Sequence, residues 1–177
     1  MPERIEKITA FRLQLDAAMN SFPYLMPSRE VSLCSTNLQR SFMWLGEALK
    51  ATGSPTPYFN SSNQANATIE PQADHKDITL MPRWESIDQT QTARVKDFRY
   101  YLEQLIQKVR YFIRVEEDII DYENEYYEYL DCIENSYWAL KEAKCWLGWE
   151  LNRIKKAKEA LEQSSISPIP KPLSLPL

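Results

Sequence analysis

The sequence predicts an all-α protein made of two antiparallel helical hairpins. Apolar residues recur every three or four positions through residues 3–49 and again through 91–163, which is the spacing of amphipathic helices. Prolines punctuate the chain between these stretches, and none occurs between Pro82 and Pro168. The predicted organisation is a hairpin at 1–52, a connector at 53–90, a longer hairpin at 91–163 and a tail at 164–177.

The first hairpin is predicted from two apolar stripes separated by a proline-containing turn. Pro23 and Pro27 end the first helix, which runs from residue 3 to residue 22. Ser28 can then cap the second helix, and Glu30 is favourable in its first turn. The stripe residues are Ile5, Ile8, Leu15, Met19 and Phe22 in the first helix and Val31, Leu38, Phe42, Leu45 and Leu49 in the second.

The connector begins at Gly53-Ser54-Pro55-Thr56-Pro57 and shows no helical period. A connector of this length is typically either functional or disordered. Its aromatic and apolar side chains, which include Tyr58 and Trp84, are candidate anchors on the hairpins. The tail is rich in proline and is expected to be extended or disordered, either as a solvated end or as a ligand for a proline-binding partner.

The second hairpin is predicted from heptads that run from Val95 to Leu161. One unbroken helix of about 70 residues would be about 105 Å long. Residues 116–134 contain nine acids and no base, whereas residues 94–114 are rich in arginine and lysine. A fold-back near Asp118–Asn124 would set the acidic segment against the basic one, so two helices are favoured over one rod.

The triplet Trp-Leu-Gly occurs twice, at Trp44-Leu45-Gly46 and at Trp146-Leu147-Gly148, in a chain with only three glycines. A glycine inside a helix costs about 1 kcal/mol relative to alanine. The absence of Cβ would allow another helix to approach closely, within the chain or between chains. Alternatively, this turn of the helix forms one wall of a ligand pocket, in which Trp44 supplies a flat aromatic face.

The composition excludes several functional classes. The net charge of −4 leaves no broad basic surface for duplex nucleic acid, although a small anion needs only a few local arginines. The three cysteines are widely spaced, as expected for free thiols in a reducing compartment, and no apolar run predicts a signal peptide or a membrane span. Because His75 is the single histidine, neither a metal site nor a catalytic base is predicted, and the expectation is a protein without enzymatic activity or cofactor.

One segment resembles a known family. The residues Pro27-Ser28-Arg29-Glu30, Ser32-Leu33, Leu38 and Met43-Trp44-Leu45-Gly46-Glu47-Ala48-Leu49 are similar to the helical-hairpin domain of the phage anti-CBASS and anti-Thoeris proteins. Those immune-evasion proteins sequester cyclic nucleotides or cyclic ADP-ribose isomers. The resemblance covers residues 3–52 and extends into the connector through Pro57-Tyr58, Ile69-Glu70-Pro71 and Ala73-Asp74.

The resemblance implies a homo-oligomer in the cytoplasm of a bacterial host cell that hides a defence messenger. Such a protein needs arginines for phosphates, aromatic faces for purines and amides for ribose or base edges. The candidate ligand-binding residues are Arg29, Trp44, Tyr58, Asn60 and Trp84. Each also has a structural reading: Arg29 as an exposed arginine of the capping turn, Tyr58 and Trp84 as anchors, and Asn60 as a turn residue.

This chain starts almost directly at the first helix and lacks the lead-in segment that cyclic-dinucleotide binders use. Because of this departure, a cyclic ADP-ribose isomer is favoured over a cyclic dinucleotide as the expected ligand. The alternative reading, favoured by the heptads alone, is a coiled-coil scaffold that binds a host or phage protein.

Overall fold

The computed structural model describes residues 2–54, 90–119 and 128–165, and all regular structure in these ranges is helical. The elements are α1 (Pro2–Asn20), a short 3-10 turn η1 (Phe22–Tyr24), α2 (Arg29–Ala51), α3 (Gln91–Ile119) and α4 (Glu128–Ser165). The all-α prediction is therefore confirmed for this part of the chain. Most of the predicted connector and nearly all of the tail lie outside the described residues.

Helix α2 begins and ends at the residues that its sequence predicts. Ser28 is the N-cap, and its hydroxyl accepts a hydrogen bond of 3.1 Å from the Val31 amide. At the other end Gly53 has a φ of 76°, the left-handed conformation that glycine adopts without strain. The Gly53 amide donates to the Lys50 carbonyl and the Ser54 amide to the Leu49 carbonyl, each at 3.0 Å, which is the Schellman pattern.

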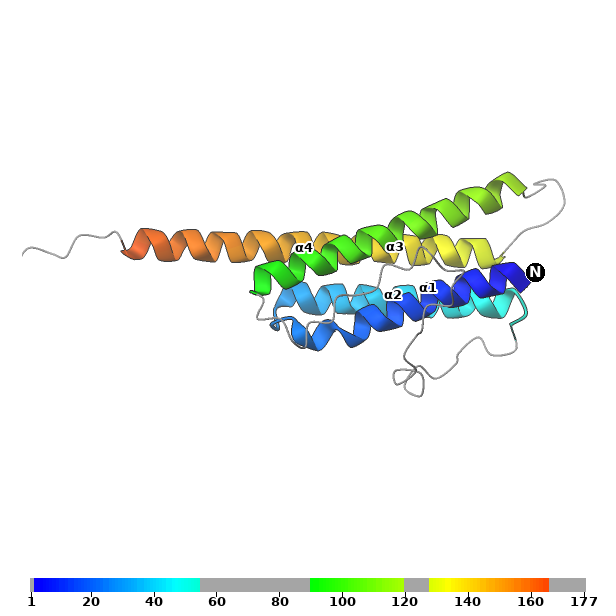
Figure 1. Ribbon diagram of the computed structural model, residues 1–177, viewed down its shortest axis with the longest axis horizontal. Coiled ribbons are helices and arrows are strands. Elements are labelled where there is room, and N and C mark those ends of the chain that lie inside the picture. The colour runs from blue at the N-terminus through cyan, green and yellow to red at the C-terminus, as the bar shows by residue number, and fades with distance from the viewer. Residues whose placement is uncertain (1, 55–89, 120–127, 166–177) are drawn as a thin grey trace, which may run out of the picture.

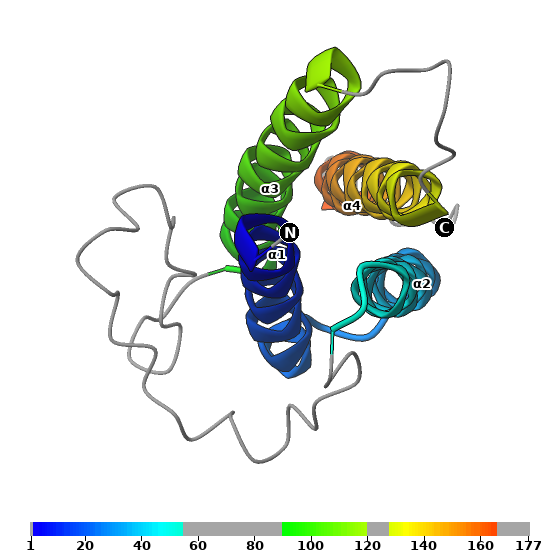
Figure 2. The ribbon, with the colours of Figure 1, turned by 90° about the vertical axis from the view of Figure 1, so that its right-hand side faces the viewer.

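The four helices form a bundle in which each packs against two antiparallel neighbours, in the ring order α1, α2, α4, α3 (Figure 2). Contacts between Ser28 and Glu150 and between Ser41 and Ser136 show that α2 and α4 run in opposite directions. Because neighbours in this ring are antiparallel, α2 and α3, which lie diagonally opposite one another, run parallel. The end of α2 and the start of α3 therefore lie at opposite ends of the bundle, as in bundles with a long crossover connection.

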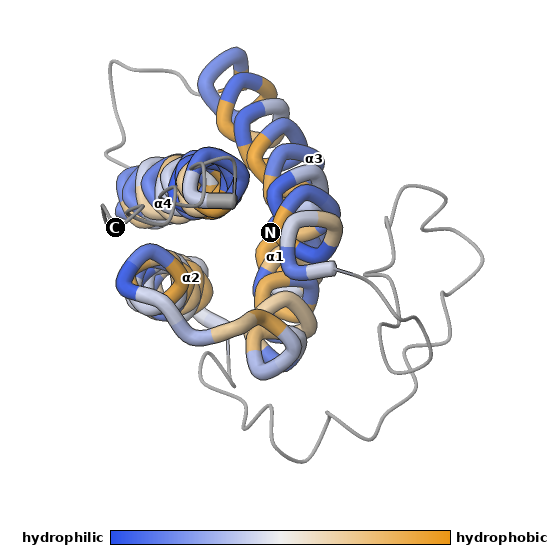
Figure 3. The backbone as a smooth tube through the Cα atoms, turned by 90° about the vertical axis from the view of Figure 1, so that its left-hand side faces the viewer, coloured by the Kyte–Doolittle hydropathy of each residue, from blue (hydrophilic) through white to orange (hydrophobic). Residues whose placement is uncertain are grey.

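The core forms where the apolar stripes of the four helices meet (Figure 3). Edge-on ring contacts join α1 to α3 through Phe11 and Phe112, with centroids 5.7 Å apart. All six residues of the predicted α3 stripe are buried, which confirms that face: Val95, Phe98, Leu102, Leu105, Val109 and Phe112.

Helices α3 and α4 pack antiparallel, as the predicted fold-back requires (Figure 1). An ion pair between the two helices joins Lys144 of α4 to Glu103 of α3, the opposite sense from the one predicted. Near the start of α4, Glu134 lies close to two other acids, Glu117 of α3 and Asp131. Burial raises the pKa of Glu134, and the nearby Glu117 and Asp131 raise it further.

Helix α4 continues past the bundle as a single projecting rod (Figure 1). Residues 155–164 are all exposed, and Leu161, a predicted heptad position, is 71% exposed. The apolar pattern of α4 therefore continues beyond the part of the helix that α1, α2 and α3 cover. In the described part of one chain, no other helix covers this end.

Candidate functional site

The first helical residue of α2 is Arg29, which the sequence singles out for anion binding. The adjoining cap is tied to α4 by a buried carboxylate. Ser28 Oγ donates to Glu150 Oε2 at 2.9 Å, and the Glu150 side chain is fully buried. Arg153 donates to both oxygens of this carboxylate, from Nε and Nη2, at 2.8 Å each. Gln91 at the start of α3 lies 3.5 Å from the second oxygen, so Glu150 links three helices.

The Glu150 pKa is lowered from its ordinary value. The largest cause is the hydrogen bonding from Arg153, and the hydrogen bond from Ser28 acts in the same direction. Burial opposes these effects but does not overcome them. Glu150 is therefore held as a carboxylate beside the N-terminus of α2, where the helix dipole also favours a negative charge.

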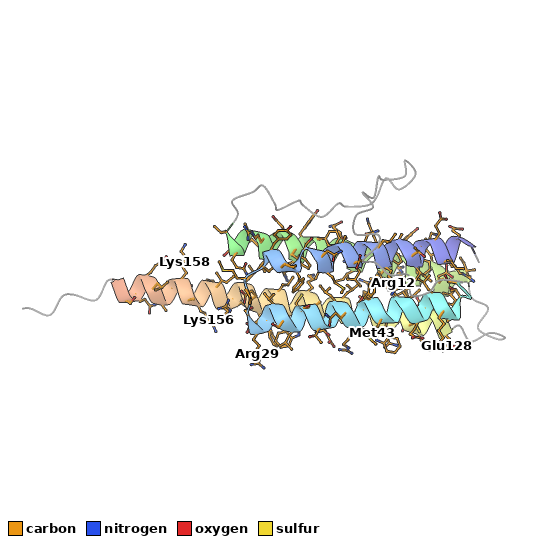
Figure 4. The ribbon with its side chains drawn as sticks, turned by 90° about the horizontal axis from the view of Figure 1, so that it is seen from below. Arg12, Arg29, Met43, Glu128, Lys156 and Lys158 are labelled. Carbon is orange, nitrogen blue, oxygen red and sulfur yellow. The ribbon has the colours of Figure 1, made fainter. Side chains whose placement is uncertain are left out.

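This carboxylate changes the electrostatic setting of the predicted anion site. Arg153 is engaged by Glu150 and lies 3.6 Å from Glu30, so two carboxylates already neutralise it. Arg29 itself is exposed at the first residue of α2 (Figure 4). At this end of α2, a phosphate would therefore approach Arg29 from the solvent side.

Trp44 lies in the third quarter of the same helix and is partly buried against the core. Because α2 is continuous, the Cα atoms of Arg29 and Trp44 are about 22 Å apart at 1.5 Å per residue. Such a separation exceeds the reach of one small nucleotide. The structure therefore does not bring these two candidates into one pocket within a chain. The remaining candidates, Tyr58, Asn60 and Trp84, lie outside the described residues.

The outer face of α4 carries a feature that the sequence analysis missed. Of the five tryptophans in the chain, Trp44 lies on α2 and three lie on α4: Trp138, Trp146 and Trp149. Trp138 is 56% exposed and Trp149 is 53% exposed. Lys141 lies over the Trp138 ring at 4.3 Å, and Trp146 meets Trp149 edge-on at 4.4 Å. The sequence shows the spacing of these tryptophans along α4. The apolar heptads, however, do not predict that Trp138 and Trp149 lie outside the core.

The two Trp-Leu-Gly glycines occupy different environments. Gly46 is buried in α2, whereas Gly148 in α4 is only partly buried. A Cβ atom at Gly148 would meet Arg99 Nε at 3.8 Å, an ordinary contact with a flexible side chain. Among the described residues of one chain, no close helix approach requires glycine at 148, and a close approach between chains stays a prediction.

Beyond the cap of α2, the described residues show three further features. Within the described ranges, no cluster of histidine, cysteine, aspartate or glutamate side chains is arranged to hold a metal ion. Among the same residues, no helix is long and apolar enough to cross a membrane. A second buried carboxylate, Glu116, accepts 2.6 Å contacts from Tyr129 Oη and Arg4 Nε, which ties α1, α3 and α4 together.

Comparisons of the chain with family models, with characterised proteins and with solved structures find no match.

Proposed function

We propose that the protein binds and sequesters a nucleotide second messenger of bacterial defence without catalysis. The ligand class is a cyclic ADP-ribose isomer or a cyclic oligonucleotide. The observation that supports this proposal is the hairpin itself. The residues that resemble the anti-CBASS and anti-Thoeris proteins lie just before and within one continuous helix, α2, which is capped at Ser28 and packs against α1. Arg29 stands exposed at the start of that helix, as an anion-binding role requires.

The separation of Arg29 from Trp44 shapes the proposal. A small messenger cannot touch both in one chain, so a complete pocket would combine α2 of one copy with another copy or with residues of 55–89. Tyr58, Asn60 and Trp84 are the candidates in that stretch for base stacking and for polar contacts. A homo-oligomer would supply the first of these two sources.

The test is binding and recovery. Purified full-length protein is titrated with cyclic ADP-ribose isomers and with cyclic di- and trinucleotides, one at a time, while its melting temperature is followed. A ligand at 100 times its dissociation constant should add about 2.7 kcal/mol to the free energy of unfolding. Heating the complex should release the messenger unchanged, as judged by chromatography and mass spectrometry. Conversion of the messenger would contradict sequestration without catalysis.

A second candidate function is a scaffold that binds a host or phage protein. The exposed tryptophans of α4 and the projecting rod at 155–164 favour it, because exposed aromatic surface is typical of interaction sites. The titration separates the two. A melting temperature that no nucleotide shifts would favour the scaffold.

A further inference from the structure

The exposed stripe of α4 has an unusual symmetry. Its members are Asp131, Trp138, Glu142, Cys145, Trp149 and Lys156, all exposed. About two helical turns separate Asp131 from Trp138, and the same interval separates Trp149 from Lys156. The two charged residues, Asp131 and Lys156, and the two tryptophans are therefore centred on the same point, between Ala143 and Lys144. An acid stands at one end of the stripe, a base at the other, and a tryptophan lies inside each.

We propose that this stripe is the interface of a homodimer in which α4 of one copy packs antiparallel on α4 of a second copy. A two-fold interface must be complementary to itself. Antiparallel pairing about the common midpoint places Trp138 opposite Trp149 of the second copy, and Asp131 opposite its Lys156. Each contact occurs twice. The stripe spans about 37 Å, and Figure 4 shows Glu128 and Lys156 toward opposite ends of α4.

The chemistry of the stripe fits a second copy better than an unrelated partner. Tryptophans at the centre supply large apolar area, and charges at the ends fix the register, which is the usual anatomy of a specific interface. A parallel arrangement would instead set Asp131 against Asp131 and Lys156 against Lys156. Glu142, near the centre of the stripe, is paired with Arg40 of its own chain at 3.2 Å, so its charge is already matched within the chain.

The dimer does not depend on nucleotide binding, so its test uses the protein alone. Sedimentation of the full-length chain over a concentration series should show a monomer–dimer equilibrium. Trp138→Ala and Trp149→Ala should each weaken association by roughly 100-fold or more, since each substitution removes two central contacts. Tyr111→Ala is the matched control. Tyr111 is 73% exposed on α3, away from the stripe, and its removal should leave association unchanged.

Charge exchange tests the register. Asp131→Lys and Lys156→Asp should each weaken association by roughly tenfold, because each puts like charges opposite one another at two places. Combining both substitutions in one chain restores opposite charges and should restore association. Circular dichroism melts establish that each variant remains folded.

A cross-link gives a second measure of the register. Glu142→Cys sets a thiol opposite Cys145 of the second copy, and oxidised glutathione should convert the pair into an intermolecular disulfide. The same substitution in a Cys145→Ser background should give far less cross-linking. A protein that is monomeric throughout the concentration series overturns the proposal. So does a dimer that neither the tryptophan nor the charge substitutions weaken, because that dimer uses another face.

Discussion

Ser28 and Glu150, 122 positions apart in the sequence, share a hydrogen bond of 2.9 Å that joins the start of α2 to the middle of α4. The Ser28 hydroxyl accepts from the Val31 amide at the same time. The N-cap of one hairpin is thus also a contact with the other. Helix formation in α2 and docking of the two hairpins therefore stabilise each other.

The first prediction concerns the charge of Glu150. Replacing Glu150 by glutamine keeps the shape of the side chain but removes the charge that Arg153 and Ser28 stabilise. We expect the free energy of unfolding at pH 7 to fall by about 1.5–3 kcal/mol, the usual range for hydrogen bonds to a charged group. Urea unfolding measures this difference. Glu142→Gln, at an exposed pair with Arg40, is the control and should cost less than about 1 kcal/mol.

The pH dependence of that difference follows from the direction of the shift. The Glu150 pKa is lower in the folded protein than in the unfolded chain. Its contribution is therefore fully present above the unfolded pKa of about 4.3 and is lost as the pH falls through the lower, folded value. The gap between wild type and Glu150→Gln should narrow below about pH 4. An equal gap at pH 7 and pH 3 would show that shape, not charge, explains it.

The second prediction concerns a buried pair of hydroxyls between the hairpins. Ser41 and Ser136 are both fully buried, and their oxygens lie 2.7 Å apart. Ser41→Ala leaves the Ser136 hydroxyl without this partner and should cost about 1–3 kcal/mol. Ser41→Ala combined with Ser136→Ala removes both polar groups, so the double variant should be more stable than the sum of the single changes predicts. Strict additivity in a double-mutant cycle would show that the two hydroxyls are not coupled.

The third prediction separates the glycines that the sequence makes look alike. Gly148→Ala adds a Cβ atom where only the Arg99 side chain lies within reach, and it should stabilise the protein by up to about 1 kcal/mol. Gly53→Ala is the contrasting control, because its φ of 76° strains any L side chain and should make the substitution destabilising. Thermal unfolding measures both changes. A destabilising Gly148→Ala would indicate a close contact at 148 that a single chain does not contain.

Gly46 is buried, so a leucine there must displace its neighbours. Gly46→Leu is expected to destabilise the bundle by about 1–3 kcal/mol and, only through that loss of stability, to disrupt assembly. Light scattering alongside the melt distinguishes the two effects. Unchanged stability together with unchanged mass would contradict a packing role for Gly46.

The sequence predicted the helices well because the signals for them are local. The Ser28 cap, the Gly53 terminus and the α3 stripe each depend on residues within a few turns. The contacts through which the two hairpins pack were not predicted, because Glu150 and Ser28 give no local sign that they meet. Nor was the exposure of Trp138, since apolar periodicity places a tryptophan on a face but does not say which neighbour, if any, covers that face.

The candidate site was the least predictable part for a related reason. A list of residue types suited to a nucleotide carries no distances, and a continuous helix separates Arg29 from Trp44 by about 22 Å. Their joint role in one pocket requires a second source of residues. Because Trp44 lies too far from Arg29 to contact the same messenger within one chain, the contribution of Arg29 to binding can be measured separately.

The last prediction therefore isolates Arg29. If a phosphate of the messenger binds there, Arg29→Ala should weaken binding by roughly tenfold to 100-fold, the loss expected for one charge-assisted contact. Because Arg29 is exposed, the free energy of unfolding without ligand should change by less than about 0.5 kcal/mol. Arg110→Ala is the matched control, since Arg110 is an exposed arginine on α3. Calorimetric titration with the messenger that shifts the melt gives both affinities. Equal affinities for the two variants would remove Arg29 from the site. The bound phosphate would then have to be held by residues elsewhere in the chain.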